Sequence, residues 1–133
     1  ETAFIPDSSG QSHELYEGGG TIQRNTSTRR GKTNIVDIEV DTSKIYNLQA
    51  KTFNRRKPLG EIDEASGVRK YSDEYNPAKE IGFISEEVYP EVPSVVTLDD
   101  EGNPLGIQYS MISVLLVEEV KKLKDRIEAL EGN

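Results

Sequence analysis

The sequence predicts an α+β fold: a small mixed domain of short strands and helices, with an extended N-terminal segment, a protruding arm over 56–79 and a C-terminal helix. Three patterns indicate this class. Apolar and acidic residues alternate in "NIVDIEVD" (34–41), a hairpin pattern occupies 95–109, and a heptad repeat runs through the last segment. Alternation is typical of a half-buried strand, and the heptad repeat is typical of a coiled-coil helix.

The composition limits how much core this chain can form alone. The chain has 133 residues, which fits one domain, and only 34% of them are hydrophobic while 30% are charged. Globular domains usually contain about 45–50% apolar residues when glycine is counted. We therefore expect either that part of the chain is extended and weakly packed, or that other copies of the chain complete the core.

Charge and residue usage exclude several classes of partner. A net charge of −8 argues against nucleic acid and against an anionic membrane, and no apolar run approaches the roughly 18–20 residues of a membrane span. The chain has no cysteine, and His13 is its only histidine. No glycine-rich phosphate-binding motif is present. We expect no metal site, no cofactor, no nucleic acid and no membrane partner.

The first half is expected to change from polar chain to short elements. Residues 1–31 are poor in apolar groups and read either as a linker or as the end of a preceding structure. Val36, Ile38 and Val40 predict a half-buried strand. Asp41 or Thr42 is then a plausible N-cap of one or two helical turns over 42–48, and 50–56 reads as a short strand with its phenylalanine pointing inward.

The middle of the chain predicts an exposed segment followed by small elements. Residues 56–79 contain two prolines, two glycines and many charges, which favours a solvated loop or an exposed hairpin. A buried strand over 82–84 is expected next. Ser85 is then predicted to cap a short helix that ends at Tyr89-Pro90, and a hairpin follows with strands at 95–98 and 104–109.

The last segment, 110–131, carries a coiled-coil pattern. Its apolar residues are spaced four, three, four and three apart, which gives a narrow seam made of Leu116, Val120, Leu123, Ile127 and Leu130. In a parallel coil the flanking charges would pair Glu119 with Lys124 and Arg126 with Glu131 of a neighbouring chain.

An amphipathic helix packed on its own domain is the alternative to this coil. Ile112 and Leu115 lie off the seam, so we expect the start of the helix to pack on its own domain and the rest on other copies. The seam is too short to hold chains together unaided, and its residues leave the number of copies open.

One polar stretch, "STRRGK" (27–32), holds a candidate catalytic pair. Ser27 is a weak nucleophile until a base takes its proton, and Lys32 can be that base only as a neutral amine. Nearby Arg24, Arg29 and Arg30 disfavour a further positive charge on this lysine. Residues five apart do not meet on a helix or a strand, so the pair needs a turn at Arg30-Gly31 or a lysine from a neighbouring chain. A connecting loop without chemistry is the alternative interpretation.

Four stretches in order carry a family resemblance. "STRRGKTNI" (27–35) is followed by "IYNLQAKTF" (45–53), "GFISEEVYPEVP" (82–93) and "YSMISVLLVEEVKKLKDRIEAL" (109–130). Together they resemble the C-terminal intramolecular chaperone, auto-processing domain of phage tailspikes, endosialidases, tail fibres and neck appendages. The third stretch is similar to the family's GFIAQEV…P, with Ser85 and Glu86 at the Ala and Gln positions. The fourth is similar to its Y-x-x-L-x-x-L-L-x-x-A-x-K-E-L helix. Gly31 stands where many relatives carry a larger apolar residue.

The resemblance implies both an architecture and a reaction. Such domains trimerise, guide the folding of the β-rich stalk that precedes them, and then cut themselves off before a serine. Carried over, Ser27 is the nucleophile, Lys32 its base, and Thr26–Ser27 the bond that is cut, so the chain is a single-turnover self-cleaving serine endopeptidase. The heptad helix becomes the seam of a homotrimer, and 56–79 becomes an arm that grips the stalk. Backbone amides around Gly31 are candidate donors to the oxyanion.

The same resemblance implies a domain division and a setting. Residues 1–26 would be the end of the stalk, and 27–133 the chaperone domain, whose client is the stalk of its own chain. Assembly would take place in the cytoplasm of a host bacterium. The upstream part would remain in the virion tail, and the chaperone would be released. An alternative is the same trimeric assembly module without cleavage. A generic coiled-coil adaptor and a peptidase that acts on other proteins fit the sequence less well.

Overall fold

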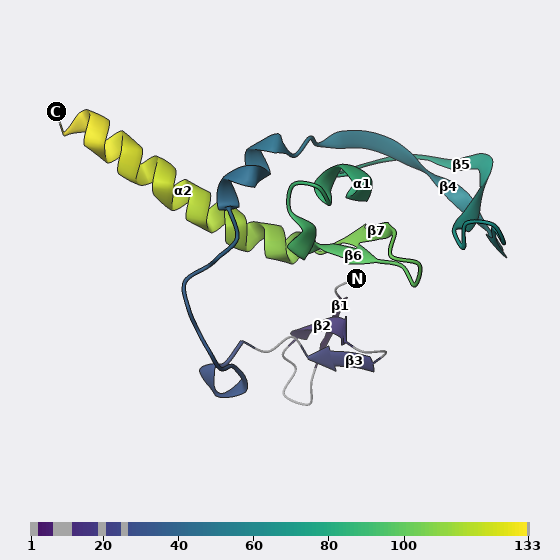
Figure 1. Ribbon diagram of the computed structural model, residues 1–133, viewed down its shortest axis with the longest axis horizontal. Helices are drawn as coiled ribbons and strands as arrows, with labels where there is room; N and C mark the ends of the chain where they lie inside the picture. The colour runs from purple at the N-terminus through teal and green to yellow at the C-terminus, as the bar shows by residue number, and fades with distance from the viewer. Residues whose placement is uncertain (1–2, 7–11, 19–20, 25–26, 133) are drawn as a thin grey trace. The chain divides into compact units, whose positions relative to one another are not determined.

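The computed structural model describes residues 3–6, 12–18, 21–24 and 27–132, in two compact units over Glu1–Glu39 and Val40–Asn133. The first unit contains β1 (Ala3–Pro6), β2 (Ser12–Gly18) and β3 (Thr21–Arg24), which form an antiparallel sheet in the order β1-β2-β3 (Figure 1). Of the two interpretations of 1–31, a linker does not fit where these strands lie, and the end of a preceding structure stays a prediction. A single 3-10 turn, η1 (Arg29–Gly31), follows.

The segment 33–41, which we call the strap, is not the predicted strand. Its backbone is irregular, Asn34 has a φ of 53°, and Val36 is 69% exposed. The alternation of Val36, Ile38 and Val40 is real, but a strand also needs a neighbour with which to pair. In the described part of the chain, no strand pairs with the strap. Its apolar side chains are consequently left exposed.

The second unit begins with a short helix that the sequence predicted. The 3-10 helix η2 runs over Thr42–Asn47, and Asp41 is its N-cap, with its side chain accepting from the backbone N–H of Ser43 at 3.1 Å. Ile45 and Leu48 pack against the core. Their spacing of three suits the 3-10 form, in which side chains three apart lie on one side.

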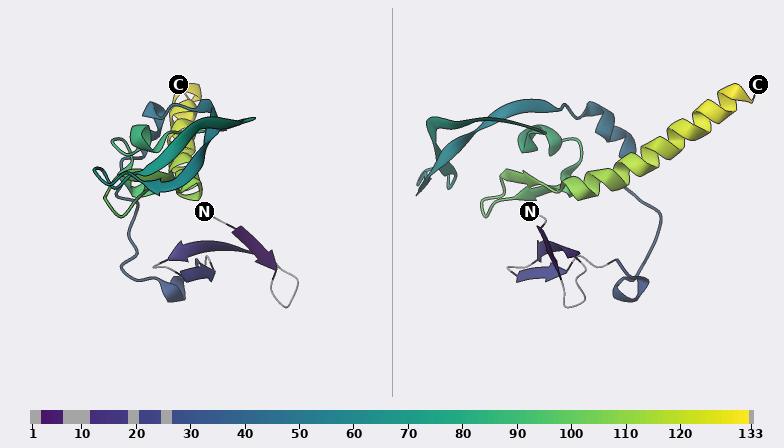
Figure 2. Two further views of the ribbon diagram at one scale, coloured as in Figure 1. Left: turned by 90° about the vertical axis from the view of Figure 1, so that its right-hand side faces the viewer. Right: turned by 180° about the vertical axis from the view of Figure 1, so that it is seen from behind.

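The predicted exposed segment is an antiparallel hairpin. Strands β4 (Lys51–Ile62) and β5 (Arg69–Gly82) pair over most of their length, with several irregularities in register. Figures 1 and 2 show this hairpin curving away from the rest of its unit as an arm, while the free end of α2 projects from the opposite side. The predicted strand near Phe53 thus exists but is longer than expected. Ion pairs between Arg55 and Glu80 and between Lys57 and Glu74 connect its two strands.

The predicted buried strand over 82–84 was wrong. Strand β5 ends at Gly82, and the backbone N–H of Phe83 donates to the Tyr109 hydroxyl at 2.9 Å rather than to a strand. The two rings stack with their centroids 6.1 Å apart. A Cβ on Gly82 would lie 2.6 Å from that hydroxyl, so glycine is required for this close approach.

The remaining elements follow the sequence prediction closely. Helix α1 (Ser85–Val88) has Ile84 at its N-cap position with no side-chain cap, so the predicted cap by Ser85 was wrong, and the helix ends at Tyr89 as expected. A 3-10 turn, η3 (Pro93–Val95), leads into the hairpin of β6 (Val96–Leu98) and β7 (Pro104–Ile107). Helix α2 covers Tyr109–Glu131. None of the helices in the described residues is both long and apolar enough to cross a membrane.

The core of the second unit is small and involves the start of α2. Its buried apolar side chains come from α1, η3, the segment between them and α2: Val88, Val92, Val95, Ile112 and Leu115. The prediction that Ile112 and Leu115 pack on their own domain is confirmed. The five seam residues further along α2 are exposed in the single chain, from 42% for Leu123 to 76% for Leu130.

Truncating Leu115 is expected to destabilise the second unit strongly. Its side chain is 3% exposed, and Leu→Ala changes in packed cores cost about 2–5 kcal/mol in the free energy of unfolding. Val114→Ala, at a neighbouring position that is 55% exposed, is the control and should change this free energy by less than about 0.5 kcal/mol. Urea unfolding of both variants measures the difference. Equal stability of the two variants would contradict the assignment of the core.

Candidate functional site

The stretch 27–32 is folded by the 3-10 turn η1. Thr28 is the N-cap: its side-chain oxygen accepts from the backbone N–H of Arg30 at 3.4 Å, and its carbonyl accepts from Gly31 at 3.1 Å. The N–H of Lys32 donates to the carbonyl of Arg29 at 3.1 Å. These bonds reverse the chain within a few residues, and they bring both ends of "STRRGK" to the same side.

The turn brings the two candidate catalytic side chains together within one chain. The Nζ atom of Lys32 lies 2.6 Å from the Oγ atom of Ser27. Nζ donates to Oγ in this hydrogen bond; if the amine is neutral, its lone pair can instead accept the serine proton over the same distance. Both residues are exposed, and Thr26 lies outside the described residues. A lysine from a neighbouring chain is not needed for the contact.

Glycine 31 has a different role from the one predicted. Its φ is not in the left-handed region, which the structure assigns to Gly60, Gly67 and Gly102. A Cβ at Gly31 would make an ordinary contact of 3.9 Å with the Thr28 side chain. A side chain at this position would therefore fit the turn. The N–H groups of Gly31 and Lys32 donate within η1, and the role of backbone amides around Gly31 as oxyanion donors stays a prediction.

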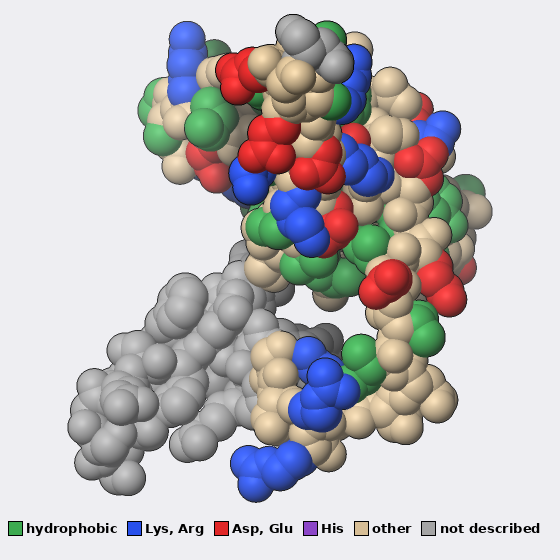
Figure 3. Space-filling view, turned by 90° about the vertical axis from the view of Figure 1, so that its left-hand side faces the viewer, with side chains coloured by type: hydrophobic (Ala, Val, Ile, Leu, Met, Phe, Trp, Pro, Cys, Tyr) green, Lys and Arg blue, Asp and Glu red, His purple; other side chains and the backbone are tan. Residues whose placement is uncertain are grey.

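The surroundings of the pair are cationic. Arg29, Arg30 and Lys32 are all exposed, and Figure 3 shows Lys and Arg side chains gathered on the described part of the first unit. The pair therefore lies in a cationic stretch that is exposed in the single chain.

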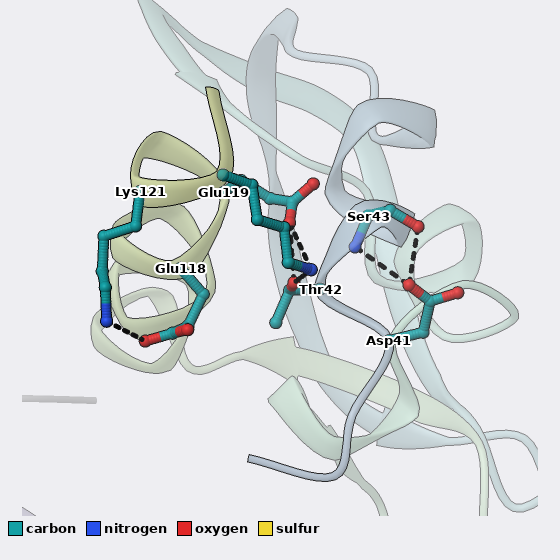
Figure 4. Close-up of polar contacts among 7 residues, drawn as sticks. Asp41, Thr42, Ser43, Glu118, Glu119 and Lys121 are labelled. Atoms are coloured by element: carbon teal, nitrogen blue, oxygen red, sulfur yellow. Dashed lines mark hydrogen bonds and ion pairs between the residues drawn. The ribbon is translucent and has the colours of Figure 1, made fainter. Parts of the chain in front are cut away.

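A second polar group lies at the junction of η2 and α2, and the sequence did not predict it. Thr42, Glu119 and Lys122 form what we call the Glu119 cluster, of which Figure 4 labels Thr42 and Glu119. The Thr42 hydroxyl donates to Oε2 of Glu119 at 2.7 Å, and Nζ of Lys122 lies 2.9 Å from the same oxygen and 2.8 Å from the Thr42 oxygen. Thr42 is 2% exposed and Glu119 is 5% exposed.

The cluster corrects one prediction about the coiled coil. Glu119 was expected to pair with Lys124 of a neighbouring chain, but its carboxylate is held inside its own chain, and Lys124 pairs with Glu128 one turn along α2. The pairing of Arg126 with Glu131 stays a prediction. The spacing of three between Glu119 and Lys122 was a visible signal for their ion pair. The contribution of Thr42, 77 residues away, had no local signal.

Charge interactions shift three pKa values around this cluster. Hydrogen bonds from Lys122 and Thr42 lower the pKa of Glu119 below its ordinary value of 4.5, although burial and Asp41 oppose the shift. The hydrogen bond to Glu119 raises the pKa of Lys122 above 10.5. Hydrogen bonds from Ser43 lower the pKa of Asp41. The cluster is thus held together as an ion pair over the whole neutral range.

These shifts predict an acid-sensitive contribution to stability. A carboxyl group whose pKa is lower in the folded state stabilises that state above its unfolded pKa, and this contribution is lost as pH falls through the folded pKa. The parent should therefore unfold at a higher temperature than Glu119→Gln. This difference in thermal midpoint should be constant near neutral pH and should shrink below about pH 4.5. Thermal unfolding from pH 7 to pH 3 measures it. An advantage that does not change with pH would contradict the ion pair.

Comparison with known protein families decides the identity of the fold. The family model described as the chaperone of endosialidase, a peptidase family, matches residues 27–97, which is more than half of the chain. The chain belongs to this family. The match begins at Ser27 and includes η1, the strap, η2, the arm and α1. Among curated proteins, no match to the chain was found.

Membership of the endosialidase chaperone family confirms the resemblance read from the sequence. It supports a chaperone role toward a tail protein. The match covers "GFISEEVYPEVP" but ends before α2. The family match therefore does not test the seam on α2 or the trimer. It also does not test the catalytic role of Ser27 and Lys32.

Proposed function

We propose that this chain is a trimerisation and folding chaperone for a phage tail fibre, tailspike or neck appendage, and that it releases itself by cutting the Thr26–Ser27 bond. The observation that carries the reaction is the 2.6 Å separation between Lys32 Nζ and Ser27 Oγ. The start of the family match at Ser27 supports a domain boundary at the same place. The two compact units of the fold divide after Glu39, which is a boundary in packing. The proposed division between residues 26 and 27 is a different boundary, namely the peptide bond that is cut.

The reaction uses the two side chains in sequence. The Lys32 amine takes the proton of the Ser27 hydroxyl as Oγ bonds to the carbonyl carbon of Thr26. The bond from that carbon to the Ser27 nitrogen then breaks, and the nitrogen receives the proton. Thr26 is left as an ester on Ser27 Oγ. Water hydrolyses the ester and gives a Thr26 carboxylate and a free Ser27 hydroxyl, so each chain turns over once.

The exposed apolar surface of the second unit supports the homotrimer. All five seam residues are exposed in the single chain, while the start of α2 is buried in its own core. Contiguous exposed apolar side chains on a helix mark a surface that another chain covers. We propose three copies, because the resemblance described in the sequence analysis implies a trimer. In this proposal, the arm (β4 and β5) contacts the stalk, and assembly takes place in the cytoplasm of the bacterial host.

The chaperone role is tested by separating the client from the domain. The upstream region expressed with residues 27–133 should accumulate as a soluble trimer that lacks these residues. Expressed alone, it should be aggregated or monomeric, because its β-rich trimer needs the chaperone to nucleate. Sedimentation velocity distinguishes these states. An upstream region that reaches the same trimer alone would contradict the role, whereas a trimer that keeps residues 27–133 would leave a chaperone without cleavage.

A further inference from the structure

The polypeptide after the catalytic pair is first held by a buried side chain at Thr42. Every side chain from Ser27 to Asp41 is exposed, and the strap has neither helix nor strand. Thr42 is 2% exposed, and its hydroxyl is bonded to Glu119 and Lys122 on α2. The strap therefore leads from the turn of the catalytic pair directly to an anchor on the C-terminal helix.

The anchor cannot form until the end of the chain has folded. Glu119 and Lys122 lie 77 and 80 residues after Thr42, on the last helix of the chain. Without α2, the Thr42 hydroxyl loses both partners.

The catalytic pair has a reason to depend on this anchor. Ser27 and Lys32 are both exposed in the single chain, and a lysine acts as a base most readily where water is excluded. Because both side chains are exposed in the single chain, we expect η1 to pack against another surface when it reacts. The strap is a tether whose C-terminal end is fixed at Thr42, so its length limits how far η1 can move. Limiting the positions of a reacting group in this way can change a reaction rate by orders of magnitude.

We propose that Thr42, Glu119 and Lys122 are positioning residues that couple self-cleavage to the folding of α2: they fix the strap to the helix and thereby hold the Ser27–Lys32 turn where it can react. This inference rests on the proposed cleavage. It gives the chain an order of events, because the bond that frees the client is cut only after the C-terminal helix is in place.

The chain offers a matched control for the test. Half-buried Glu118 and exposed Lys121 form an ion pair on the adjacent side of α2, with 3.6 Å between their charged atoms (Figure 4). Glu118→Gln removes the same charge from the same helix as Glu119→Gln and breaks neither of the hydrogen bonds of Thr42, although the Glu118 charge contributes to the raised pKa of Lys122.

The experiment uses the full chain with its upstream region. A denaturing gel measures the cleaved fraction over time, and native mass spectrometry measures the oligomeric state. Glu119→Gln and Thr42→Val should slow cleavage on the order of tenfold while the trimer persists, and Glu118→Gln should cleave at the parent rate. The double variant Thr42→Val/Glu119→Gln should be no slower than the slower single variant, because both changes release one anchor.

A strap insertion separates positioning from stability. Three residues, Gly-Ser-Gly, inserted between Asp37 and Ile38 lengthen the tether and leave the Glu119 cluster intact. Slower cleavage at an unchanged thermal midpoint is expected. Parent-rate cleavage by the insertion variant, or by both cluster variants, would overturn the coupling while the proposed cleavage stands. A parent chain that is never cut would overturn both.

Discussion

Replacing Ser27 with alanine is expected to leave the chain uncut. The reaction has no other nucleophile, and loss of the catalytic serine in a serine protease lowers turnover by on the order of 10⁶-fold. Lys32→Ala should have a comparable effect, because the hydroxyl then lacks the amine that lies 2.6 Å away. Lys32→Arg should also fail, since a guanidinium stays protonated and cannot act as a base. The cleaved fraction on a denaturing gel over time measures all three.

The absence of cysteine allows a chemical rescue of this site. In Lys32→Cys, the introduced thiol is the only one within residues 1–133, and aminoethylation of that thiol restores a primary amine close to its original position. Partial recovery of cleavage is expected. Ser110→Ala and Lys121→Ala, at exposed positions of α2, serve as controls and should cleave normally. Cleavage that persists in Ser27→Ala, or that is lost in both controls, would refute the assignment of the pair.

The double variant Val120→Asp/Ile127→Asp is expected to convert the trimer into monomers. Both residues lie on the seam, where a trimer would bury them, and both are exposed in the single chain, at 62% and 53%. An uncompensated buried charge costs about 3–5 kcal/mol, so several of them exceed what a short seam contributes. The fold of the monomer should survive, because its core lies at the other end of α2.

The control for the seam is Val114→Asp. This residue is on the same helix and is 55% exposed, but it is not part of the seam. Sedimentation equilibrium should give a trimer for the parent and for Val114→Asp, and a monomer for the double variant. A trimer that survives the double variant would show that α2 is not the axis of assembly. Cleavage should also be lost in the monomer if η1 docks on a neighbouring chain.

Elements that depend on local sequence were predictable. Helix α2, the cap of η2 by Asp41, the short helix α1 and the two hairpins all arise from spacing, capping and turn residues within about 25 positions. The contact between Ser27 and Lys32 belongs to this group, because a turn with few residues brings the two together. Sequence spacing could indicate such a turn, although not its 3-10 form.

Features that depend on distant residues were not predictable. The strap has the alternation of a strand, but pairing requires a second strand that no local pattern supplies. The strand expected over 82–84 failed because Phe83 bonds instead to Tyr109, which lies 26 residues away. The Glu119 cluster depends on Thr42, whose side chain looks like an ordinary helix cap in sequence. A single sequence gives the residue types at these positions, while the fold determines their partners.

The intact mass of the parent chain, expressed with its upstream region and measured under denaturing conditions, tests the central claim most directly. The account predicts two fragments and no uncut chain: one that begins at Ser27 and runs to the C-terminus, and one that ends at Thr26. A single uncut mass from a protein that sediments as a trimer, or a cut at any other bond, would contradict self-cleavage by Ser27 and Lys32.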